Sequence, residues 1–208
     1  MKLLIFGSTG GTGHQLVELA LARGHAVTAF ARNPTKVSIK DPNLKIARGD
    51  VTDVASIERA MPGQEAVLSA LGSSGRTKDT ARSEGMPNIV RAMQAAGVRR
   101  LVCLSSMGIG DSRDMLPFLS RYVLVPLFMR QGFAEHELQE ACVKRSGTDW
   151  TIVRPAALTN GARTGVYRHG LVADQSIKRK ISRADVADFM LKQLVENTYL
   201  RKSPWISY

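Results

Sequence analysis

The chain has 208 residues, of which 44% are hydrophobic and 23% charged, and it contains two cysteines. This length suits one domain with a proper hydrophobic core, and the composition excludes a disordered or fibrous protein. No apolar run reaches the roughly 18 residues of a membrane span, and the N-terminus lacks the long apolar stretch of a signal peptide. Two cysteines are too few for a disulfide framework or a metal cluster. We therefore expect a cytoplasmic protein with no metal and no membrane partner.

The net charge of +11 is the unusual feature of the composition. Such a charge suits a nucleic acid, an anionic surface or small anionic ligands. The basic residues are spread along the chain and form neither a basic helix nor a ribbon interleaved with aromatic residues. The densest segment, 161–183, has six Lys or Arg against one Asp. This pattern argues against a nucleic-acid partner and leaves two readings open, an anionic ligand or a solvated basic surface.

Short aliphatic runs alternate with longer amphipathic stretches along the chain, which is the rhythm of βαβ units. Strands are expected at residues 2–6, 25–31, 44–47, 66–71, 100–105, 150–153 and 205–206. The first helix is expected to follow the glycine-rich residues 7–13 and to end at Gly24. A further helix is expected to end at Gly97, with a start or a kink at Pro87. The other helices are expected at residues 54–60, 133–145 and 186–194. The pattern predicts a single α/β domain over residues 1–208, with a mostly parallel, doubly wound sheet and helices on both faces.

A glycine-rich loop joins the first predicted strand to the first predicted helix. It reads Gly7-Ser8-Thr9-Gly10-Gly11-Thr12-Gly13, with glycines at every third position. In this context the backbone N–H groups of the loop approach a pyrophosphate, and the helix N-terminus adds partial positive charge. The alternative is a purely structural turn. The strand before the loop and the helix after it favour dinucleotide binding.

The end of the second strand indicates which dinucleotide is bound. NAD enzymes usually place an acidic residue there for the ribose hydroxyls, but this chain has Arg32 directly after Ala31. An arginine suits a 2′-phosphate through charge-assisted hydrogen bonds, with Lys36 as a helper. The alternative is a solvated arginine in a turn. The sequence favours NADP(H).

Two further turns follow predicted strands and belong to the same region. Gly49-Asp50-Val51 could flank the adenine, although Asp50 could instead cap a helix, and Leu71-Gly72-Ser73-Ser74 would let the chain pass close to the cofactor. Ligands of such sheets bind at the carboxyl ends of the strands, where both turns lie.

The motifs GSTGGTG, FARN, GDVTD, SEGMPNIVRAMQAAGVRRLVCLSS and SGTDWTIVRPAAL together resemble the atypical short-chain dehydrogenase/reductase superfamily. Within it, the chain is most similar to the NAD(P)H-binding group around biliverdin reductase B, also called flavin reductase. The resemblance covers residues 2–195. It implies a Rossmann-type sheet of about seven strands, NADPH bound across the sheet, and hydride transfer to flavins or linear tetrapyrroles.

The resemblance also implies roles for individual residues. Ser106, at the end of the fifth strand, takes the position of a serine near the nicotinamide and the substrate, and His136 takes that of an active-site histidine. Segments 107–130 and 155–183 are the expected substrate loops. The residues expected to bind the cofactor are Gly7, Thr9, Gly10, Gly11, Thr12, Gly13, Arg32, Asp50, Val51, Leu71, Gly72, Ser105, Pro155 and Ala156.

The chain departs from the family pattern at two places. The Tyr-x-x-x-Lys pair of the superfamily is missing, because Tyr122 is followed four residues later by Pro126 and Tyr167 by Leu171. Ala157 replaces a second histidine of biliverdin reductase B, which argues against tetrapyrrole specificity. Hydride transfer between stacked rings needs mainly positioning, so flavin reduction is less affected.

Two hypotheses of different classes follow from the sequence. The first is an NADPH-dependent reductase of a small flavin-like, quinone or tetrapyrrole acceptor, with Ser106 and His136 at the reacting centre. The second is a non-catalytic NADP(H)-binding redox sensor or assembly factor, related to NmrA-like regulators and acting through a protein partner. The oligomeric state stays open.

Overall fold

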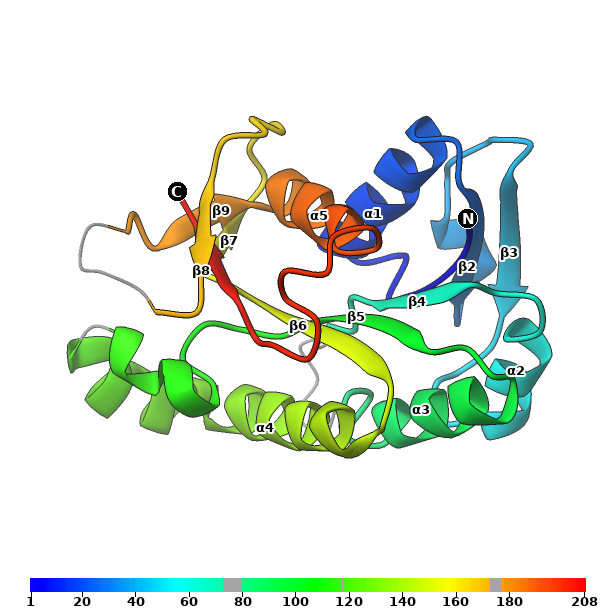
Figure 1. The fold of residues 1–208 in the computed structure, drawn as a ribbon. Coiled ribbons are helices and arrows are strands. Elements are labelled where there is room, and N and C mark those ends of the chain that lie inside the picture. The colour runs from blue at the N-terminus through cyan, green and yellow to red at the C-terminus, as the bar shows by residue number, and fades with distance from the viewer. Residues whose placement is uncertain (73–79, 117, 173–176) are drawn as a thin grey trace.

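An eight-stranded sheet lies between two layers of helices in the computed structural model, which describes residues 1–72, 80–116, 118–172 and 177–208 (Figure 1). In sheet order, the strands are β3 (Leu44–Arg48), β2 (Ala26–Ala31), β1 (Lys2–Phe6), β4 (Ala66–Ser69), β5 (Arg100–Leu104), β6 (Asp149–Pro155), β10 (Trp205–Ser207) and β8 (Arg168–Gly170). All neighbouring strands are parallel except β10 and β8. Two further strands, β7 (Ala157–Thr159) and β9 (Lys180–Ser182), pair in a small parallel sheet.

The helices cover both faces of the sheet. The α-helices are α1 (Gly11–Ala22), α2 (Val54–Ala60), α3 (Gly85–Ala95), α4 (Arg130–Arg145) and α5 (Arg183–Lys192). Three other helical segments are η1 (Pro34–Lys36) and η2 (Gly110–Met115), which are 3₁₀-helical, and η3 (Ser120–Met129), which is π-helical. Figure 1 shows α1 and α5 on one face and α2, α3 and α4 on the other.

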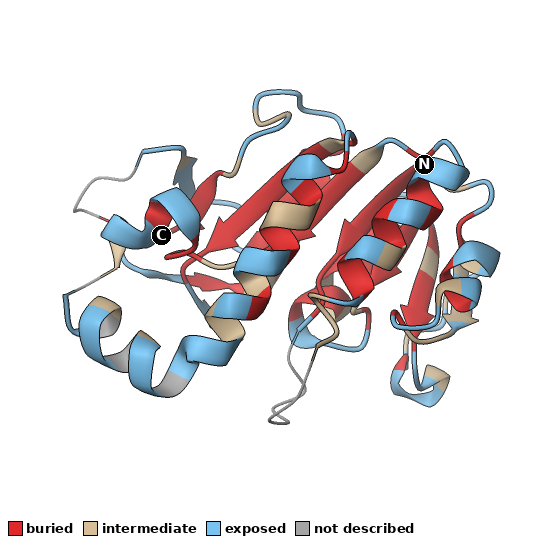
Figure 2. Ribbon diagram, turned by 90° about the horizontal axis from the view of Figure 1, so that it is seen from below, coloured by how far each residue is buried: buried red, intermediate tan, exposed pale blue. Residues whose placement is uncertain are grey.

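Alternation along the strands explains the two layers, because successive side chains of a strand point to opposite faces. In β1, Leu3 and Ile5 pack with the core under α1 and α5, whereas Leu4 and Phe6 pack with the core under α2, α3 and α4. From β2 to β10 the sheet is therefore mostly buried on both faces, as the red strands in Figure 2 show, whereas the edge strands β3 and β8 are largely exposed. Burial of this kind favours continuous apolar strands over alternating ones.

The chain changes direction in the sheet between β1 and β4. It runs outward from β1 through β2 to β3, and then crosses back to β4 on the other side of β1. The loops after β1 and β4 therefore diverge and leave a crevice at the carboxyl edge of the sheet, where open α/β sheets bind ligands. Phe6 and Ser69 are opposite each other at this point.

The fold predicted from the sequence is confirmed, with differences in detail. Helices α4 and α5 each begin three residues before the predicted start, at Arg130 and Arg183. Helix α5 starts there because the Ser182 hydroxyl accepts a hydrogen bond of 3.0 Å from the Asp185 N–H group. The short strands β7, β8 and β9 and the segments η2 and η3 were not predicted. No helix in the described part of the chain is long and apolar enough to cross a bilayer.

Candidate functional site

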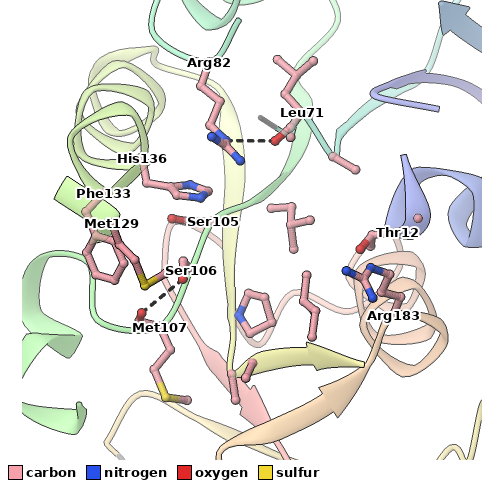
Figure 3. Close-up of a pocket in the computed structure, with 18 of the residues that line it drawn as sticks. Thr12, Leu71, Arg82, Ser105, Ser106, Met107, Met129, Phe133, His136 and Arg183 are labelled. Carbon is pink, nitrogen blue, oxygen red and sulfur yellow. Dashed lines mark hydrogen bonds between the residues drawn. The ribbon is translucent and has the colours of Figure 1, made fainter. Parts of the chain in front are cut away.

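Two adjoining cavities open at the carboxyl edge of the sheet. The larger has a volume of about 710 Å³ and extends from the glycine loop to η3 and α4, and the smaller has about 340 Å³ and extends toward the ends of β2 and β3 (Figure 3 shows the larger). Gly10, Ala70, Leu71 and Gly72 line both. The two cavities thus form a continuous site across the crevice beside β1.

The glycine loop fits a dinucleotide pyrophosphate. Gly7 has φ +75°, and a Cβ atom there would lie 2.3 Å from the Ala70 carbonyl oxygen. A Cβ atom at Gly13 would lie 2.0 Å from the Gly7 carbonyl oxygen, so this glycine allows α1 to pack against the loop. Gly10, at the N-terminus of α1, has no side chain to cap the first N–H groups of the helix, which lie beside both cavities. These groups suit an anionic ligand.

The smaller cavity has the features of the adenosine end of such a site. Arg32 and Lys36 line it from the segment after β2, and Val51 lines it from the turn after β3. Both cations lie on the side where a 2′-phosphate would bind. The Asp50 carboxylate instead accepts hydrogen bonds from the N–H and hydroxyl groups of Thr52, at 3.0 and 2.9 Å, and shapes the turn.

Most of the residues selected from the sequence line the two cavities. The smaller is lined by Gly7, Thr9, Gly10, Arg32, Val51, Leu71 and Gly72. The larger is lined by Gly10, Gly11, Thr12, Leu71, Gly72, Ser105, Ser106, His136, Pro155 and Ala156. Gly13 and Asp50 are absent from both linings; Gly13 allows the helix to pack against the loop, and the Asp50 carboxylate shapes its turn through hydrogen bonds from Thr52. Ser73 and Ser74 lie outside the described residues, as do residues 173–176 of the basic segment 161–183.

Beneath the larger cavity lies a buried ion pair. The Arg154 guanidinium binds both carboxylate oxygens of Glu140, at 2.9 and 2.7 Å, and also contacts Asp111. Ser105 donates its hydroxyl proton to Glu140 over 2.7 Å. Burial alone would raise the pKa of Glu140, but the hydrogen bonds and charge of Arg154 lower it below its usual range, so the carboxylate is ionised. The Ser105 hydroxyl can therefore offer a ligand only its lone pairs.

Ser106 and His136 bring polar atoms to the same wall. Ser106 is half-buried, and its hydroxyl donates to the Met107 carbonyl oxygen at 3.2 Å. Figure 3 shows the His136 imidazole pointing from α4 toward Ser105 and Arg82. Burial, with the charge of Arg82, lowers the pKa of His136 to about 3, so the ring is neutral at pH 7. Its Nδ1 is enclosed and has no hydrogen-bond partner in the described part of the chain.

The far end of the larger cavity is apolar. Met115, Met129 and Phe133 line it from η2, η3 and α4, and Figure 3 shows Met129 and Phe133 side by side next to Ser106. The planar ring of phenylalanine and the flexible, polarisable thioether of methionine both suit contact with an extended ring system. Segments 107–130 and 155–183 both contribute to the cavity wall.

Three arginines that line the larger cavity, Arg82, Arg179 and Arg183, were not singled out from the sequence. Arg82 lines it and donates a hydrogen bond of 3.0 Å to the Leu71 carbonyl oxygen. Arg183, the first residue of α5, packs directly against Gly11. A Cβ atom built on Gly11 would lie only 2.7 Å from the Cδ atom of Arg183. Its guanidinium is beside Thr12 at the N-terminus of α1 (Figure 3). The only sequence signal for Arg183 was the basic density of segment 161–183, which does not indicate which arginine reaches the site.

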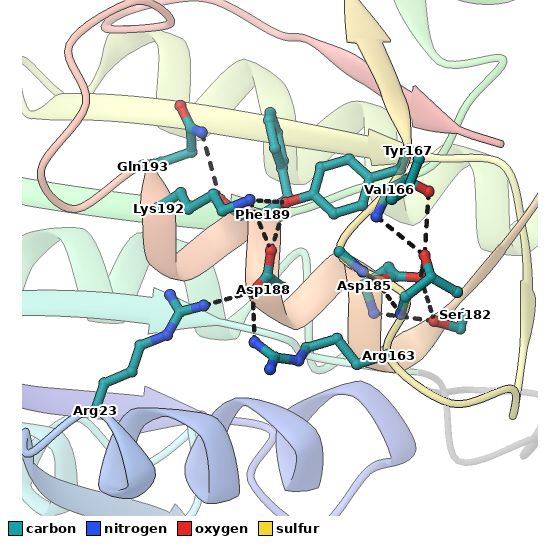
Figure 4. Close-up of polar contacts among 12 residues, drawn as sticks. Arg23, Arg163, Val166, Tyr167, Ser182, Asp185, Asp188, Phe189, Lys192 and Gln193 are labelled. Atoms are coloured by element: carbon teal, nitrogen blue, oxygen red, sulfur yellow. Dashed lines mark hydrogen bonds and ion pairs between the residues drawn. The ribbon is translucent and has the colours of Figure 1, made fainter.

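A hydrogen-bonded corner surrounds Asp185 and Asp188 of α5, the helix that begins at Arg183 (Figure 4). The buried Asp185 carboxylate accepts hydrogen bonds from the hydroxyls of Ser182, Thr164 and Tyr208 at 3.0, 2.9 and 2.6 Å. One turn later, Asp188 binds Arg23 of α1 as well as Arg163 and Lys192. This corner ties the chain end and segment 160–168 to the helix that carries Arg183.

These features, a glycine loop at the N-terminus of a helix and an arginine after β2, are those of a nucleotide site in an open α/β sheet. The family model described as NAD(P)H-binding matches residues 7–197. The chain belongs to this NAD(P)H-binding family. As a member of this NAD(P)H-binding family, the protein binds NADP(H) or NAD(H).

Two relatives and one solved structure illustrate the range of this NAD(P)H-binding family. The photosystem II assembly factor Ycf39 of Synechocystis is 25% identical over 98% of the chain and 61% of its own length. A (4-alkanoyl-5-oxo-2,5-dihydrofuran-3-yl)methyl phosphate reductase of Streptomyces griseus is 28% identical over 74% of the chain and 46% of its own length. The chain thus spans about half to three fifths of these relatives. The anaerobilin reductase ChuY of Escherichia coli O157:H7 shares the fold, with a TM-score of 0.83 and 23% identity over 100% of this chain and 97% of ChuY.

Proposed function

We propose that the protein is an NADPH-dependent reductase that acts on a flat, conjugated acceptor in the larger cavity. The observation that carries the proposal is the composition of that cavity. Its inner end is the glycine loop and the N-terminus of α1, and its outer end is the apolar wall of Met115, Met129 and Phe133. A volume of about 710 Å³ has room for one end of a dinucleotide and a second ring stacked on it.

The preference for NADPH over NADH rests on Arg32. Its side chain is exposed at the smaller cavity, where Lys36 adds a second positive charge. A guanidinium binds a phosphate through paired hydrogen bonds, whereas it has no comparable partner on an unphosphorylated ribose.

Hydride transfer from NADPH to a conjugated acceptor requires mainly that the protein position the two ring systems. NADPH, when bound, supplies a hydride, which carries two electrons to the acceptor, and the reduced acceptor then takes up one proton. Ser106 and the neutral ring of His136 orient the rings by hydrogen bonding, and the proton comes from solvent because His136 carries none to spare at neutral pH. Met129 and Phe133 exclude water from one face of the acceptor. The reductase named among the relatives supports this class of reaction.

The experiment is to measure NADPH oxidation with FMN, FAD, biliverdin and a simple quinone. We expect turnover of about one per second or faster with at least one of them, which is the lower end for typical enzymes. The Phe133→Ala variant should raise the KM for that acceptor several-fold and leave the Kd for NADPH unchanged. Leu138→Ala is the matched control, because this side chain lies on the same helix and is exposed.

A second candidate function is supported by two observations. The assembly factor Ycf39 matches 98% of the chain, and this chain lacks the Tyr-x-x-x-Lys pair of the superfamily. An NADP(H)-binding assembly factor or redox sensor would bind NADPH tightly and turn over none of the acceptors. That result would replace the reductase proposal, and a pull-down with and without NADPH would then test for a protein partner.

A further inference from the structure

The helical segment η3 (Ser120–Met129) presents apolar side chains on two opposite sides. Val125 and Met129, one turn apart, line the larger cavity. On the outer side, Tyr122, Val123 and Leu127 are exposed, as are Phe118 and Leu119 directly before η3, and we call these five residues the η3 patch. Phe118 is 77% exposed and Leu127 is 69% exposed. A helix that is apolar all round normally has both sides covered, so the outer side of η3 lacks its cover in the isolated chain.

Within the segment that carries the η3 patch both charged residues are basic, and one of them, Arg121, is paired with Asp114 just before the segment. From residue 115 to residue 134 the chain contains Arg121 and Arg130 but no Asp or Glu. Arg121 contacts Asp114 and lies 5.2 Å from the centre of the Tyr122 ring, and Arg130 is exposed. Exposed Phe, Leu and Tyr side chains flanked by arginines are typical of a segment that lies in the interface of an anionic membrane.

A second exposed apolar segment lies at the same end of the molecule. Leu171 and Val172, which follow β8, are 50% and 89% exposed. Figures 1 and 2, drawn from perpendicular directions, both place η3 and the end of β8 at this end of the sheet. The exposed cations Lys178 and Lys180 follow shortly afterwards along the chain. Two apolar segments with basic neighbours therefore share one end of the protein.

We propose that this end of the protein binds to the surface of an anionic lipid bilayer, with the η3 patch inserted among the headgroups. A second copy of the chain fits the patch less well, because each copy carries a net charge of +11 and would bring its arginines against those of the other. The headgroups of an anionic bilayer instead attract the basic residues of the protein. The proposal replaces our expectation from the sequence that no membrane is involved, and it is independent of the reductase activity.

The position of the η3 patch gives membrane binding a role in the delivery of an acceptor to the larger cavity. Because η3 separates the patch from the larger cavity, an acceptor dissolved in the bilayer would reach the cavity past Val125 and Met129 without crossing bulk water. This consequence rests on the proposed reductase function, whereas lipid binding itself does not.

The test is flotation of the full chain with vesicles of phosphatidylcholine alone and of phosphatidylcholine mixed equally with phosphatidylglycerol. We expect binding to the anionic vesicles, at least about tenfold weaker binding to the neutral ones, and loss of binding with added salt. The double variant Phe118→Glu/Leu127→Glu should bind the anionic vesicles at least about tenfold more weakly than the wild type, since it places two carboxylates in the patch. Val195→Glu, at a residue that is 75% exposed beyond the end of α5, is the matched control and should bind like the wild type.

NADPH binding, followed by fluorescence, serves as the check that both variants are folded. Absence of wild-type protein from both kinds of vesicle would overturn the proposal, as would equal binding by the double variant. A dimer in gel filtration that the double variant converts to a monomer, without any change in vesicle binding, would instead assign the patch to contact between copies.

Discussion

Arg32 and His136 lie at opposite ends of the crevice, and one of them is charged whereas the other is neutral. Arg32 is an exposed, permanently charged group beside the smaller cavity, whereas His136 is an enclosed ring that stays neutral beside the larger one. The first suits a phosphate, and the second suits an uncharged ring system. The two residues therefore divide the site into an anion-binding end and an apolar end.

Replacing Arg32 tests the anion-binding end. We expect Arg32→Gln to raise the Kd for NADPH by about ten- to one-hundredfold, because a charge-assisted hydrogen bond to a phosphate is lost, and to change the Kd for NADH by less than about threefold. Fluorescence titration with both cofactors measures the two constants. Arg59→Gln, at an exposed position on α2, is the control. Equal losses for NADPH and NADH would remove the assignment of Arg32 to the 2′-phosphate.

His136 makes stability depend on pH in a defined window. In the folded protein its pKa is lowered from 6.5 to about 3 by burial and by Arg82, so the unfolded chain binds an extra proton between these values. Acidification below pH 6.5 therefore favours unfolding, and His136→Gln removes that contribution. Between pH 7 and pH 5 the wild type should lose roughly 1–2 kcal/mol more stability than the variant, measured by chemical denaturation at both pH values. Parallel losses in the two proteins would show that the ring is not enclosed.

At the scale of elements, the corner between α1, α5 and segment 160–168 supports the site from below. Asp188 lies at its centre, almost fully buried, with the Arg163 and Lys192 nitrogens at 3.1 and 3.0 Å. Burial alone would raise the pKa of Asp188, but hydrogen bonds from Tyr167 and Lys192 lower it below its usual range. The charged form is therefore the one that holds the helices together.

Asp188→Asn should lower the free energy of unfolding at pH 7 by about 1–2 kcal/mol, because it removes the buried counter-charge that three partly exposed cations share and weakens the hydrogen bonds from Tyr167 and Lys192. A lowered pKa gives stability that is present above the unfolded value and lost as the pH falls through the folded value. The difference from the wild type should thus persist from pH 7 to about pH 4 and shrink below it. Denaturant titrations across this range measure it. Glu58→Gln, in an exposed ion pair of 3.7 Å with Arg91, should change stability by less than about 0.5 kcal/mol.

Elements with a strong local pattern were predictable, and those that depend on distant partners were not. Strand β1 and the loop before α1 follow from an apolar run and a glycine motif within thirteen residues. Strands β7 and β9 have three residues each and exist because they pair with each other across more than twenty residues. Segment η3 was also missed, since Pro126 interrupts a run that is apolar on every side and has no helical period.

For the whole molecule, cofactor binding and folding are linked, because a ligand that binds only the folded chain stabilises it. NADPH at one hundred times its Kd should add about 2.7 kcal/mol to the free energy of unfolding. For a chain of this length that corresponds to a rise in Tm of roughly 5–10 °C, measurable by differential scanning fluorimetry. NADH at the same concentration should produce a much smaller rise, and similar rises with both cofactors would contradict the preference for NADPH.

The sequence by itself determined the α/β class, the parallel sheet and the cofactor loop, because each depends on residues that are neighbours along the chain. It also indicated Arg32, since the position after a strand predicts the place of a side chain at the carboxyl edge. Only the tertiary structure decided that Arg183 reaches Gly11, that Ser105 is held by Glu140 and Arg154, and that His136 is neutral. These facts depend on which distant segments the fold brings together and on how far it buries them. The local sequence pattern specifies neither the contacts between distant segments nor the extent of burial.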